Sequence, residues 1–465
     1  MKKIFFIKDT WIILIVFAVS RFISSLFDIH FEYAALFNYW QYLDVETLRN
    51  NLLDGVWYNH AQPPLFNLLI GAVLKIAGGH SAFVFSILFK LITISNTLLL
   101  YALIKKTTGH RRTSLFIALF YMLSPAAIVY ETELFYTTFI SLLFLISLYF
   151  LLKINAQPGW RTLIGFFLPL VLICFTRSMY HLLWLLVISI IMCIYFRKTD
   201  IFRKTIILSL TALLLTGSWY VKNYYLFGTF STSSWIGMNL SRNVFHDNKV
   251  ADSTKITSLD PFLPVSAYKK FITDSTTIKY RGLNDRDLLS AYKNDSLLNL
   301  NHVAYLEISG KYLQESKQFI KKHPVAFLKN AAQSSILFFT PATMYSVTKE
   351  QTLKLKYYDA LYSFNLSHFA GNKQERRIML TISAFPRILF YGIVFFWLLQ
   401  NSIRRRSISI VNLLILTIIG YVFTVSSLLE HYENMRFRFE TEPLYLLLLS
   451  QFMASILQKC KTPLK

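Results

Sequence analysis

The sequence predicts an all-α polytopic membrane protein, a helix bundle of about ten spans with interfacial helices and a small extracytoplasmic domain. Three observations predict this fold class. Of the 465 residues, 54% are hydrophobic, and the mean hydropathy is +0.43, whereas soluble proteins average about 45–50% apolar residues. Apolar runs near the length of a span recur along the chain, because a spanning helix needs about 20 mainly apolar residues. Basic residues fall in short clusters between these runs.

Ten apolar runs are expected to cross the bilayer. They lie near residues 10–27, 81–104, 113–129, 134–152, 162–176, 179–196, 205–221, 387–402, 407–428 and 441–457. The first run follows Met1-Lys2-Lys3, as a signal peptide would, but no small-residue cleavage site comes after it. We therefore expect it to remain as an uncleaved first span.

The basic clusters set the expected orientation. A net charge of +23 is also found in nucleic-acid binders, but here the Lys and Arg residues do not follow one polar face, so no nucleic-acid partner is expected. Basic residues mark cytoplasmic loops. With the N-terminus inside, the clusters all fall on the cytoplasmic side. They are Lys105-Lys106 with Arg111-Arg112, Arg197-Lys198 with Arg203-Lys204, Arg404-Arg405-Arg406, and Lys459, Lys461 and Lys465.

This orientation divides the chain into three regions. Residues 1–221 form an N-terminal transmembrane module whose first external loop, 28–80, is acidic. Residues 222–386 form an extracytoplasmic and interfacial region, and 387–465 form the C-terminal transmembrane helices. The chemistry that remains is therefore expected on the extracytoplasmic face.

Two apolar stretches within these regions are not assigned as spans. Residues 64–78 are too short to cross a bilayer and are expected to lie in its interface. Residues 325–341 are treated as interfacial or re-entrant, because a span there would place Arg404–Arg406 outside. The polar segment 241–322 is expected to form the small domain, with helical patterns at Asp287–Leu300 and Val303–Ile320.

Carboxylates in two external segments are candidates for proton transfer. The first loop carries Asp44 and Glu46, followed by His60 in His60-Ala61-Gln62-Pro63-Pro64. A carboxylate beside an acceptor hydroxyl can take its proton, although a solvated acidic loop would read the same way. Glu131 lies at the junction of two predicted spans, where it is equally well placed to cap the next helix.

Basic and polar residues in later external segments are candidates for binding an anion. Lys222 and Asn223 follow an aromatic span end, where interface anchoring is the alternative. Arg436 and Arg438 lie on the side that the positive-inside rule disfavours, and paired guanidinium groups suit phosphate oxygens. Pairing with Glu433 and Glu440 is the alternative. Further candidates for the substrate site are Asn434 beside these arginines and the external turn with Arg177 and His181.

The order of these motifs resembles the GT-C superfamily of membrane glycosyltransferases, especially bacterial relatives of protein mannosyltransferases and lipid A aminoarabinose transferases. The resemblance covers most of the chain, with loose motifs. Its carriers are the acidic first loop with His60-Ala61-Gln62-Pro63-Pro64-Leu65-Phe66, the acidic turn at Glu131, the run from Lys222-Asn223-Tyr224 to Gly228, and Asn434-Met435-Arg436-Phe437-Arg438-Phe439.

The resemblance implies a GT-C-like bundle and an inverting transfer of a hexose or pentose from a polyprenyl-phosphate-linked donor. By resemblance, Asp44 is the catalytic base, with Glu46 as the runner-up because the family's two adjacent acids are separated here by Val45. Glu131 matches the second-loop acid. Lys222, Arg436 and Arg438 match, approximately, the basic residues near the donor phosphate.

The chemistry fits this assignment, because a phosphate leaving group needs cations rather than an acid, and single displacement at the anomeric carbon inverts it. The loops lack a clean metal-ligand set, so no cofactor is required, although a divalent metal is compatible with the scheme. The implied acceptor is a glycan, lipid or protein of the cell envelope, and the implied location is the inner (plasma) membrane with a periplasmic active site.

Two other classes of protein remain open. A transporter or flippase for lipids or glycans would place ionisable groups deep between helices, whereas here most lie in predicted external loops. A binding or assembly protein on a degenerate enzyme scaffold would keep the fold without transfer.

Overall fold

The computed structural model describes residues 2–246, 252–272, 286–293 and 296–461. Within these ranges the chain is helical, with isolated β-bridges but no strand. The longer helices are α1 (Lys2–Leu26), α5 (Pro64–Ala77), α6 (Ser81–Thr108), α7 (Arg111–Leu123), α9 (Thr137–Ile154), α10 (Trp160–Thr176), α11 (Leu182–Phe196), α12 (Phe202–Phe227), α16 (Ala304–Lys322), α17 (Pro324–Phe338), α20 (Lys373–Arg405), α21 (Ile410–Leu429) and α22 (Asn434–Lys461). The shorter α-helices are α2 (Ala35–Asn38), α3 (Val45–Asn50), α4 (Leu52–Trp57), α8 (Pro125–Glu131), α13 (Ile236–Val244), α15 (Arg286–Leu289), α18 (Lys349–Lys354) and α19 (Lys356–Ser363). Six 3-10 turns lie in the described ranges: η1 (Gly78–His80), η2 (Ile256–Ser258), η3 (Val265–Tyr268), η4 (Ala342–Met344), η5 (Ser346–Thr348) and η6 (Leu366–Phe369).

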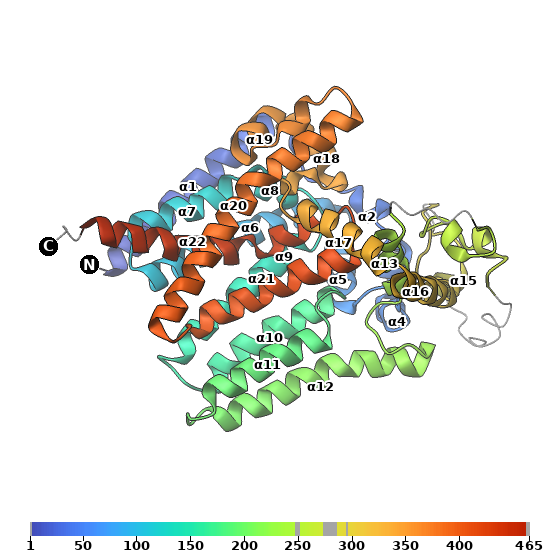
Figure 1. The fold of residues 1–465 in the computed structure, drawn as a ribbon, viewed down its shortest axis with the longest axis horizontal. Helices are drawn as coiled ribbons and strands as arrows, with labels where there is room; N and C mark the ends of the chain where they lie inside the picture. The colour runs from blue at the N-terminus through green and yellow to red at the C-terminus, as the bar shows by residue number, and fades with distance from the viewer. Residues whose placement is uncertain (1, 247–251, 273–285, 294–295, 462–465) are drawn as a thin grey trace.

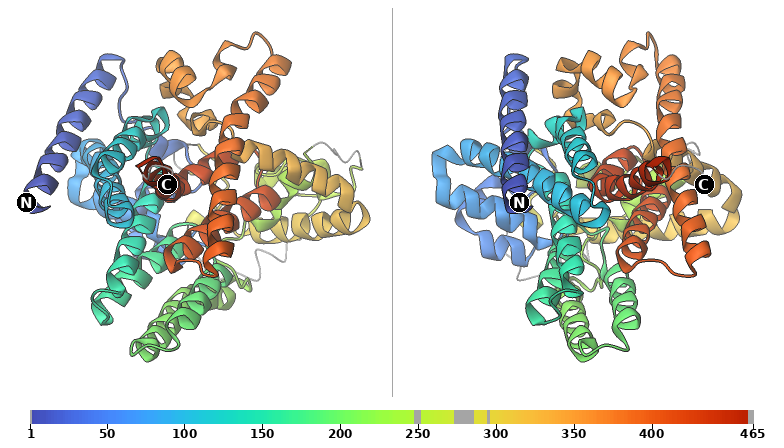
Figure 2. Two further views of the ribbon diagram at one scale, coloured as in Figure 1. Left: turned by 60° about the vertical axis from the view of Figure 1, so that its left-hand side comes forward. Right: turned by 90° about the vertical axis from the view of Figure 1, so that its left-hand side faces the viewer.

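The protein is a multi-pass α-helical membrane protein. Six helical segments among the described residues are long and apolar enough to cross a membrane, or seven if the bent pair α7 and α8 forms one span. Their outer faces carry large apolar side chains, for example Leu214 in α12 (74% exposed) and Phe396 in α20 (65% exposed). Such side chains suit contact with lipid tails. Figure 2 shows α1, α12 and α20 at the periphery of the bundle.

The sequence predicted more spans than these six. The expected runs 162–176 and 179–196 correspond to α10 and α11, which are apolar helices of 17 and 15 residues. The last expected run lies within α22, whose first turns carry charged residues. The stretches 64–78 and 325–341 form the separate helices α5 and α17.

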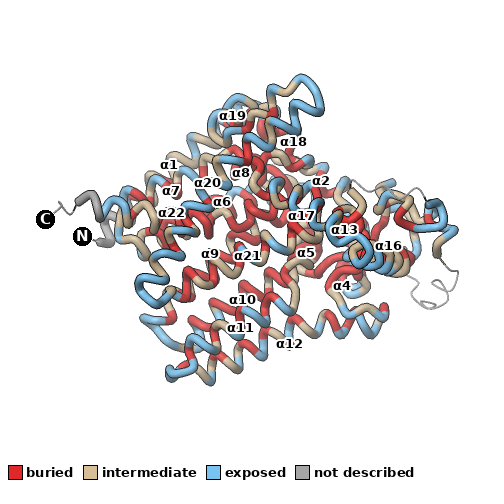
Figure 3. Tube along the Cα trace, viewed as in Figure 1, coloured by how far each residue is buried: buried red, intermediate tan, exposed pale blue. Residues whose placement is uncertain are grey.

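The centre of the bundle is formed by α9, which packs against α6, α10 and α22. Buried residues are concentrated on these inner helices, whereas α1, α12 and α20 carry many exposed residues (Figure 3). The beginning of α1 and the end of α22 lie at one end of the molecule, and α13, α15 and α16 lie at the other (Figure 1). The α11–α12 and α20–α21 turns, which carry basic clusters, lie toward the end with the termini.

A separate hydrophobic cluster holds together the polar segment after α12. It joins Trp235 and Met238 with Tyr305, Ile308 and Tyr312 of α16. The helix predicted at Val303–Ile320 is confirmed as α16. The helix predicted at Asp287–Leu300 is wrong beyond Leu289, because the chain turns back with φ +68° at Ser296 and a bridge between Tyr292 and Leu298.

Candidate functional site

A cavity of about 310 Å³ lies where the ends of α10 and α21 meet the beginnings of α13 and α22. Its charged lining residues are Arg177, Arg242, Glu430, Glu433 and Arg436. They come from three segments far apart in sequence: the α10–α11 turn, α13, and the α21–α22 turn with the first turn of α22. The described lining therefore carries three guanidinium groups and two carboxyl groups.

Arg436 is the deepest of these cations, with 2% of its surface exposed. Its Nη2 forms an ion pair with Glu433 at 2.5 Å, and its guanidinium lies 4.5 Å from the ring centre of Phe135 and 4.9 Å from that of Tyr345. Nε and Nη1 make no hydrogen bond within the described part of the chain. A buried donor without a partner is costly, so this guanidinium has unused capacity for an acceptor such as a phosphate oxygen.

Arg177 is anchored more completely. It forms an ion pair with the buried Glu440 of α22, which also accepts a hydrogen bond of 2.8 Å from the Tyr180 hydroxyl. The Arg177 guanidinium lies 3.7 Å from the ring centre of Phe437. These contacts fix the end of α10 against α22 and hold a positive charge at the cavity wall.

The two carboxyl groups of the cavity differ in their surroundings. Burial alone would raise the pKa of Glu433, but Arg436, with Arg242 and Arg177, outweighs burial and holds that pKa below its usual value. Burial raises the pKa of Glu430 to about 7, and the charge of Glu433 adds to the shift. The arginines thus favour the ionised form of Glu433, whereas burial favours the protonated form of Glu430.

The α21–α22 turn that carries both carboxyl groups is held by amide side chains. The Asn243 amide donates to the carbonyl oxygens of Ser427 (3.0 Å) and Leu428 (2.9 Å). The Asn434 amide donates to the carbonyl oxygen of Ser426 at 2.8 Å. These bonds satisfy the last carbonyl groups of α21, which have no partner inside their own helix.

The remaining lining suits a polar ligand with flat apolar faces. Aromatic rings are contributed by Trp40, Tyr136, Tyr220, Trp235 and Phe262, and hydrogen-bonding groups by Gln41, Gln62, Ser178, His181, Ser231, Thr232, Ser233 and Asn239. Aromatic walls with a few convergent polar groups are typical of small-molecule sites. Burial lowers the pKa of His181, so this ring is neutral near pH 7.

The first loop reaches this cavity through residues other than the predicted acids. Trp40, Gln41 and Gln62 line it, whereas its described lining does not include Asp44 or Glu46. Asp44 caps α3, accepting a hydrogen bond of 2.8 Å from the Glu46 backbone, and the Glu46 side chain is exposed. The sequence could not distinguish a capping carboxylate from a catalytic one, because the pattern is the same.

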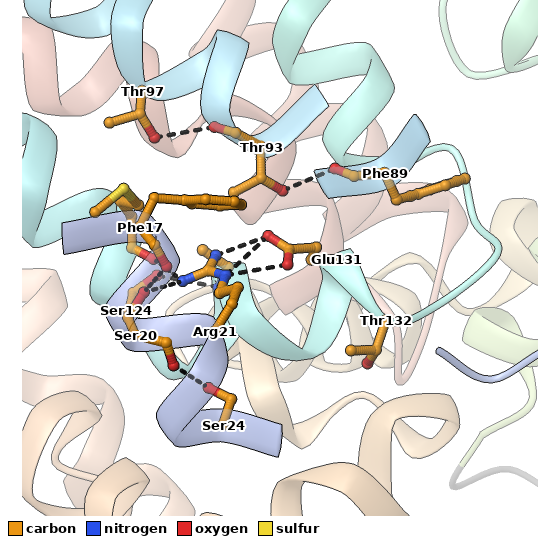
Figure 4. Close-up of polar contacts among 12 residues, drawn as sticks. Phe17, Ser20, Arg21, Ser24, Phe89, Thr93, Thr97, Ser124, Glu131 and Thr132 are labelled. Atoms are coloured by element: carbon orange, nitrogen blue, oxygen red, sulfur yellow. Dashed lines mark hydrogen bonds and ion pairs between the residues drawn. The ribbon is translucent and has the colours of Figure 1, made fainter. Parts of the chain in front are cut away.

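Glu131 lies in a different place, between α1 and α8. Arg21 of α1 donates to both of its carboxylate oxygens, with a closest distance of 2.7 Å (Figure 4). The pair is almost completely buried, with 9% and 3% of the two side chains exposed. It joins the first helix to the bundle, and it borders a cavity of only about 70 Å³.

Lys222, Asn223 and His60 lie together beside the site, but they are not in the described lining of the cavity. The Lys222 ammonium donates to the carbonyl oxygens of Trp57 (2.8 Å) and Asn59 (3.1 Å). The Asn223 amide donates to the Ser231 carbonyl at 2.6 Å. His60 contacts Ser234 through Nδ1 at 2.9 Å, and burial lowers its pKa to about 3. These contacts fasten the first loop to α12 and to the 231–235 segment.

Arg438 faces a second cavity on the opposite side of α22. This cavity, of about 300 Å³ and mostly apolar, is bordered by α7, α19, α20 and α22. The Arg438 Nε donates to the Phe338 carbonyl at 2.9 Å, and its guanidinium pairs with Glu442. The two arginines that the sequence placed on one phosphate are thus separated by the helix that carries them.

The structure brings together Arg177, His181 and Arg436 among the predicted residues, with Asn434 fixing the turn beneath them. Sequence reasoning missed Glu430 and Arg242. The available signal was a carboxylate directly after the apolar run 407–428, spaced three residues from Glu433.

The fold and the cavity define a class: a multi-pass helical membrane protein with a charged, aromatic-lined site at one end of its bundle. A scan of protein-family models and searches among curated proteins and solved structures give no match to this chain. Within the described residues, no group of three or more His, Cys, Asp or Glu residues is arranged to hold a metal ion.

Proposed function

We propose that this protein is an inverting glycosyltransferase that moves a sugar from a polyprenyl-phosphate-linked donor to an acceptor on the extracytoplasmic face of the membrane. The observation that carries the proposal is the cavity around Arg436. Its two guanidinium nitrogens without described partners match the oxygens of a phosphate. Arg177 and Arg242 add positive charge to hold the leaving phosphate, which needs no acid to protonate it.

The other side of the cavity suits the sugar and the acceptor. Trp40, Tyr220 and Trp235 offer flat apolar faces, and Gln62 and Asn239 offer hydrogen bonds. The lining of the cavity comes from the ends of the long apolar helices α12 and α21 and from residues 230–242 beyond α12. A lipid-linked donor carries its reactive carbon at headgroup level, so it would meet a site at the end of such helices.

The test is a transfer assay with purified protein in lipid nanodiscs. The protein is incubated with a panel of polyprenyl-phosphate sugars and candidate glycan, lipid and peptide acceptors, and the release of polyprenyl phosphate is measured. We expect release with one donor class and a product of inverted anomeric configuration. No release with any donor and acceptor would refute the proposal.

A flippase for lipids or glycans is the second candidate, and one observation favours it. Ion pairs with buried carboxylates join helices far apart in sequence, including Glu131 with Arg21 and Asp9 with the half-exposed Arg111, and transporters commonly place ionisable groups between helices. The same protein in sealed vesicles separates the two functions. Movement of the intact lipid-linked sugar across the bilayer, with its sugar–phosphate bond preserved, would identify the flippase.

A further inference from the structure

Glu430 occupies a distinctive position in the cavity. It directly follows α21, and its carboxyl group borders the cavity beside Arg242 and Glu433. The turn that presents it is fixed at several points. His431 contacts Ser334 at 2.8 Å, Asn243 holds the end of α21, and the backbone at Tyr432 takes the left-handed conformation with φ +78°.

Only one of the two carboxyl groups in the described lining has a cation bound to it. Glu433 is paired with Arg436 at 2.5 Å. The Glu430 side chain accepts no hydrogen bond from any residue that the structure describes and forms no ion pair with one. A carboxylate engaged by a guanidinium is a weak base, whereas one without such a partner keeps its oxygens available to a ligand.

Four charged side chains surround Glu430, and they come from different elements of the fold. Arg242 faces it from α13, Arg177 from the end of α10, Arg436 from α22, and Glu433 from its own turn. The described lining also contains the imidazole of His181, whose pKa is lowered by burial, so this ring is neutral near pH 7. Burial and Glu433 together outweigh the three arginines, so the pKa of Glu430 rises to about 7. A group with this pKa is well matched to proton transfer near neutral pH.

We infer that Glu430, rather than Asp44 or Glu46, takes the proton from the acceptor in the transfer reaction. The inference rests on the proposed function. The acceptor O–H proton passes to the Glu430 carboxylate while the acceptor oxygen forms a bond to the anomeric carbon. The bond from that carbon to the phosphate oxygen breaks, and its electron pair leaves with the lipid phosphate, which the arginines hold. Glu430 then releases the proton to water.

The test compares pH profiles of transfer for matched variants in nanodiscs. For the wild type, kcat should rise about tenfold per pH unit below a midpoint near the pKa of Glu430 and level off above it. Glu430→Gln should lower kcat by about 100- to 10,000-fold and remove this pH step. Glu430→Asp keeps a carboxylate on a shorter side chain, so it should recover part of the activity together with the pH step.

Two control variants make the comparison specific. Glu133→Gln changes another buried carboxyl group with a raised pKa, outside the described lining of the cavity, and should leave the pH midpoint in place. Asp44→Asn keeps an N-cap for α3 and removes the rival base. If Glu430→Gln kept the wild-type profile, or if Asp44→Asn alone abolished the pH step, Glu430 would not be the base. A wild type that releases no polyprenyl phosphate with any donor would overturn the proposed function, and this inference with it.

Discussion

At the residue scale, the two neighbouring arginines of α22 have different surroundings. Arg436 has guanidinium nitrogens without partners in the described structure, whereas Arg438 bonds a carbonyl and a carboxylate in a separate cavity. Residues two apart on a helix point in different directions, because successive side chains are rotated by about 100°. The sequence shows both arginines but not which one faces a ligand.

Arg436→Lys should raise the KM for the donor about tenfold or more, because Lys keeps the charge but loses the planar fork that binds two phosphate oxygens. The effect should fall mainly on KM, since the phosphate is present before and during reaction. Steady-state kinetics at varied donor concentration measures it. Arg438→Lys is the matched control and should change KM far less. Equal increases in KM for both variants would show that Arg438 also binds the donor, as the sequence predicted.

Glu133 gives the protein a defined dependence of stability on pH. Burial raises its pKa to about 8, despite the hydrogen bond of 2.8 Å that it accepts from Tyr39. A carboxyl group whose pKa is higher in the folded than in the unfolded state stabilises the fold most at low pH. This contribution is full below about pH 4.3, the pKa of an unperturbed Glu, and is lost as pH rises through about 8.

The neutral variant Glu133→Gln should therefore unfold at a higher temperature than the wild type at alkaline pH and show a flatter pH dependence. Thermal unfolding in detergent, followed across this pH range, measures the difference. A wild type and variant with parallel pH profiles would show that Glu133 ionises in the fold without cost.

At the element scale, close packing of α13 on α16 positions one wall of the cavity. A Cβ atom at Gly237 would lie 1.8 Å from the Ser309 carbonyl oxygen, so only glycine permits this contact. The Gly237 backbone also donates to the Ser309 hydroxyl at 3.0 Å. Because α13 carries Asn239 and Arg242, this contact sets the position of two lining residues.

Gly237→Ala should lower stability by about 1–3 kcal/mol, the usual cost of overpacking, and should also impair donor use by displacing Arg242. Gly217→Ala is the control: that site in α12 has open space around it, and alanine favours a helix by up to about 1 kcal/mol. The denaturation midpoints of Gly237→Ala and Gly217→Ala, each compared with that of the wild type, measure the two changes in stability. Equal stability of the two variants would show that α13 can shift away from α16 without lowering the stability of the fold.

The sequence predicted individual elements unequally well. Six of the ten expected runs coincide with helices long and apolar enough to cross a membrane, because lipid-facing helices need continuous hydrophobicity. The helix α16 was placed by its spacing of apolar residues. The pattern at Asp287–Leu300 failed because a local chain reversal leaves no clear periodic signal. In the site, Arg436 was identifiable from its charge on a disfavoured side. Glu430 was not singled out, and the cavity contacts of Trp40 and Arg242 depend on tertiary packing.

At the scale of the whole molecule, the bundle has two chemically different ends. The start of α1, the end of α22 and basic turns lie at one end, and α13 and α16 lie at the other. Because basic residues mark cytoplasmic loops, we expect the basic end in the cytoplasm and the cavity on the opposite side. Asn284, within the polar segment 241–322, lies outside the described residues, so a labelling site is chosen elsewhere in that segment.

A cysteine at the exposed Lys269 should therefore react with a membrane-impermeant maleimide added outside intact cells. In a background lacking Cys174, Cys193 and Cys460, the matched control at Arg405 should react only after the membrane is opened. If the cysteine at Arg405 reacted in intact cells and the one at Lys269 reacted only after the membrane is opened, the topology would be the opposite and the cavity would face the cytoplasm.

The buried pair of Arg21 and Glu131 also constrains how the chain is made. Its partners are separated by 110 residues, which a ribosome adds in roughly 5 to 20 s at about 5–20 residues per second. Throughout that interval the counter-ion of Arg21 has not yet been synthesised. A lone guanidinium within a bilayer is unfavourable, so Arg21 must stay near headgroups or within the insertion machinery until α8 arrives. We therefore expect α1 to enter the membrane before its contact with α8 can form.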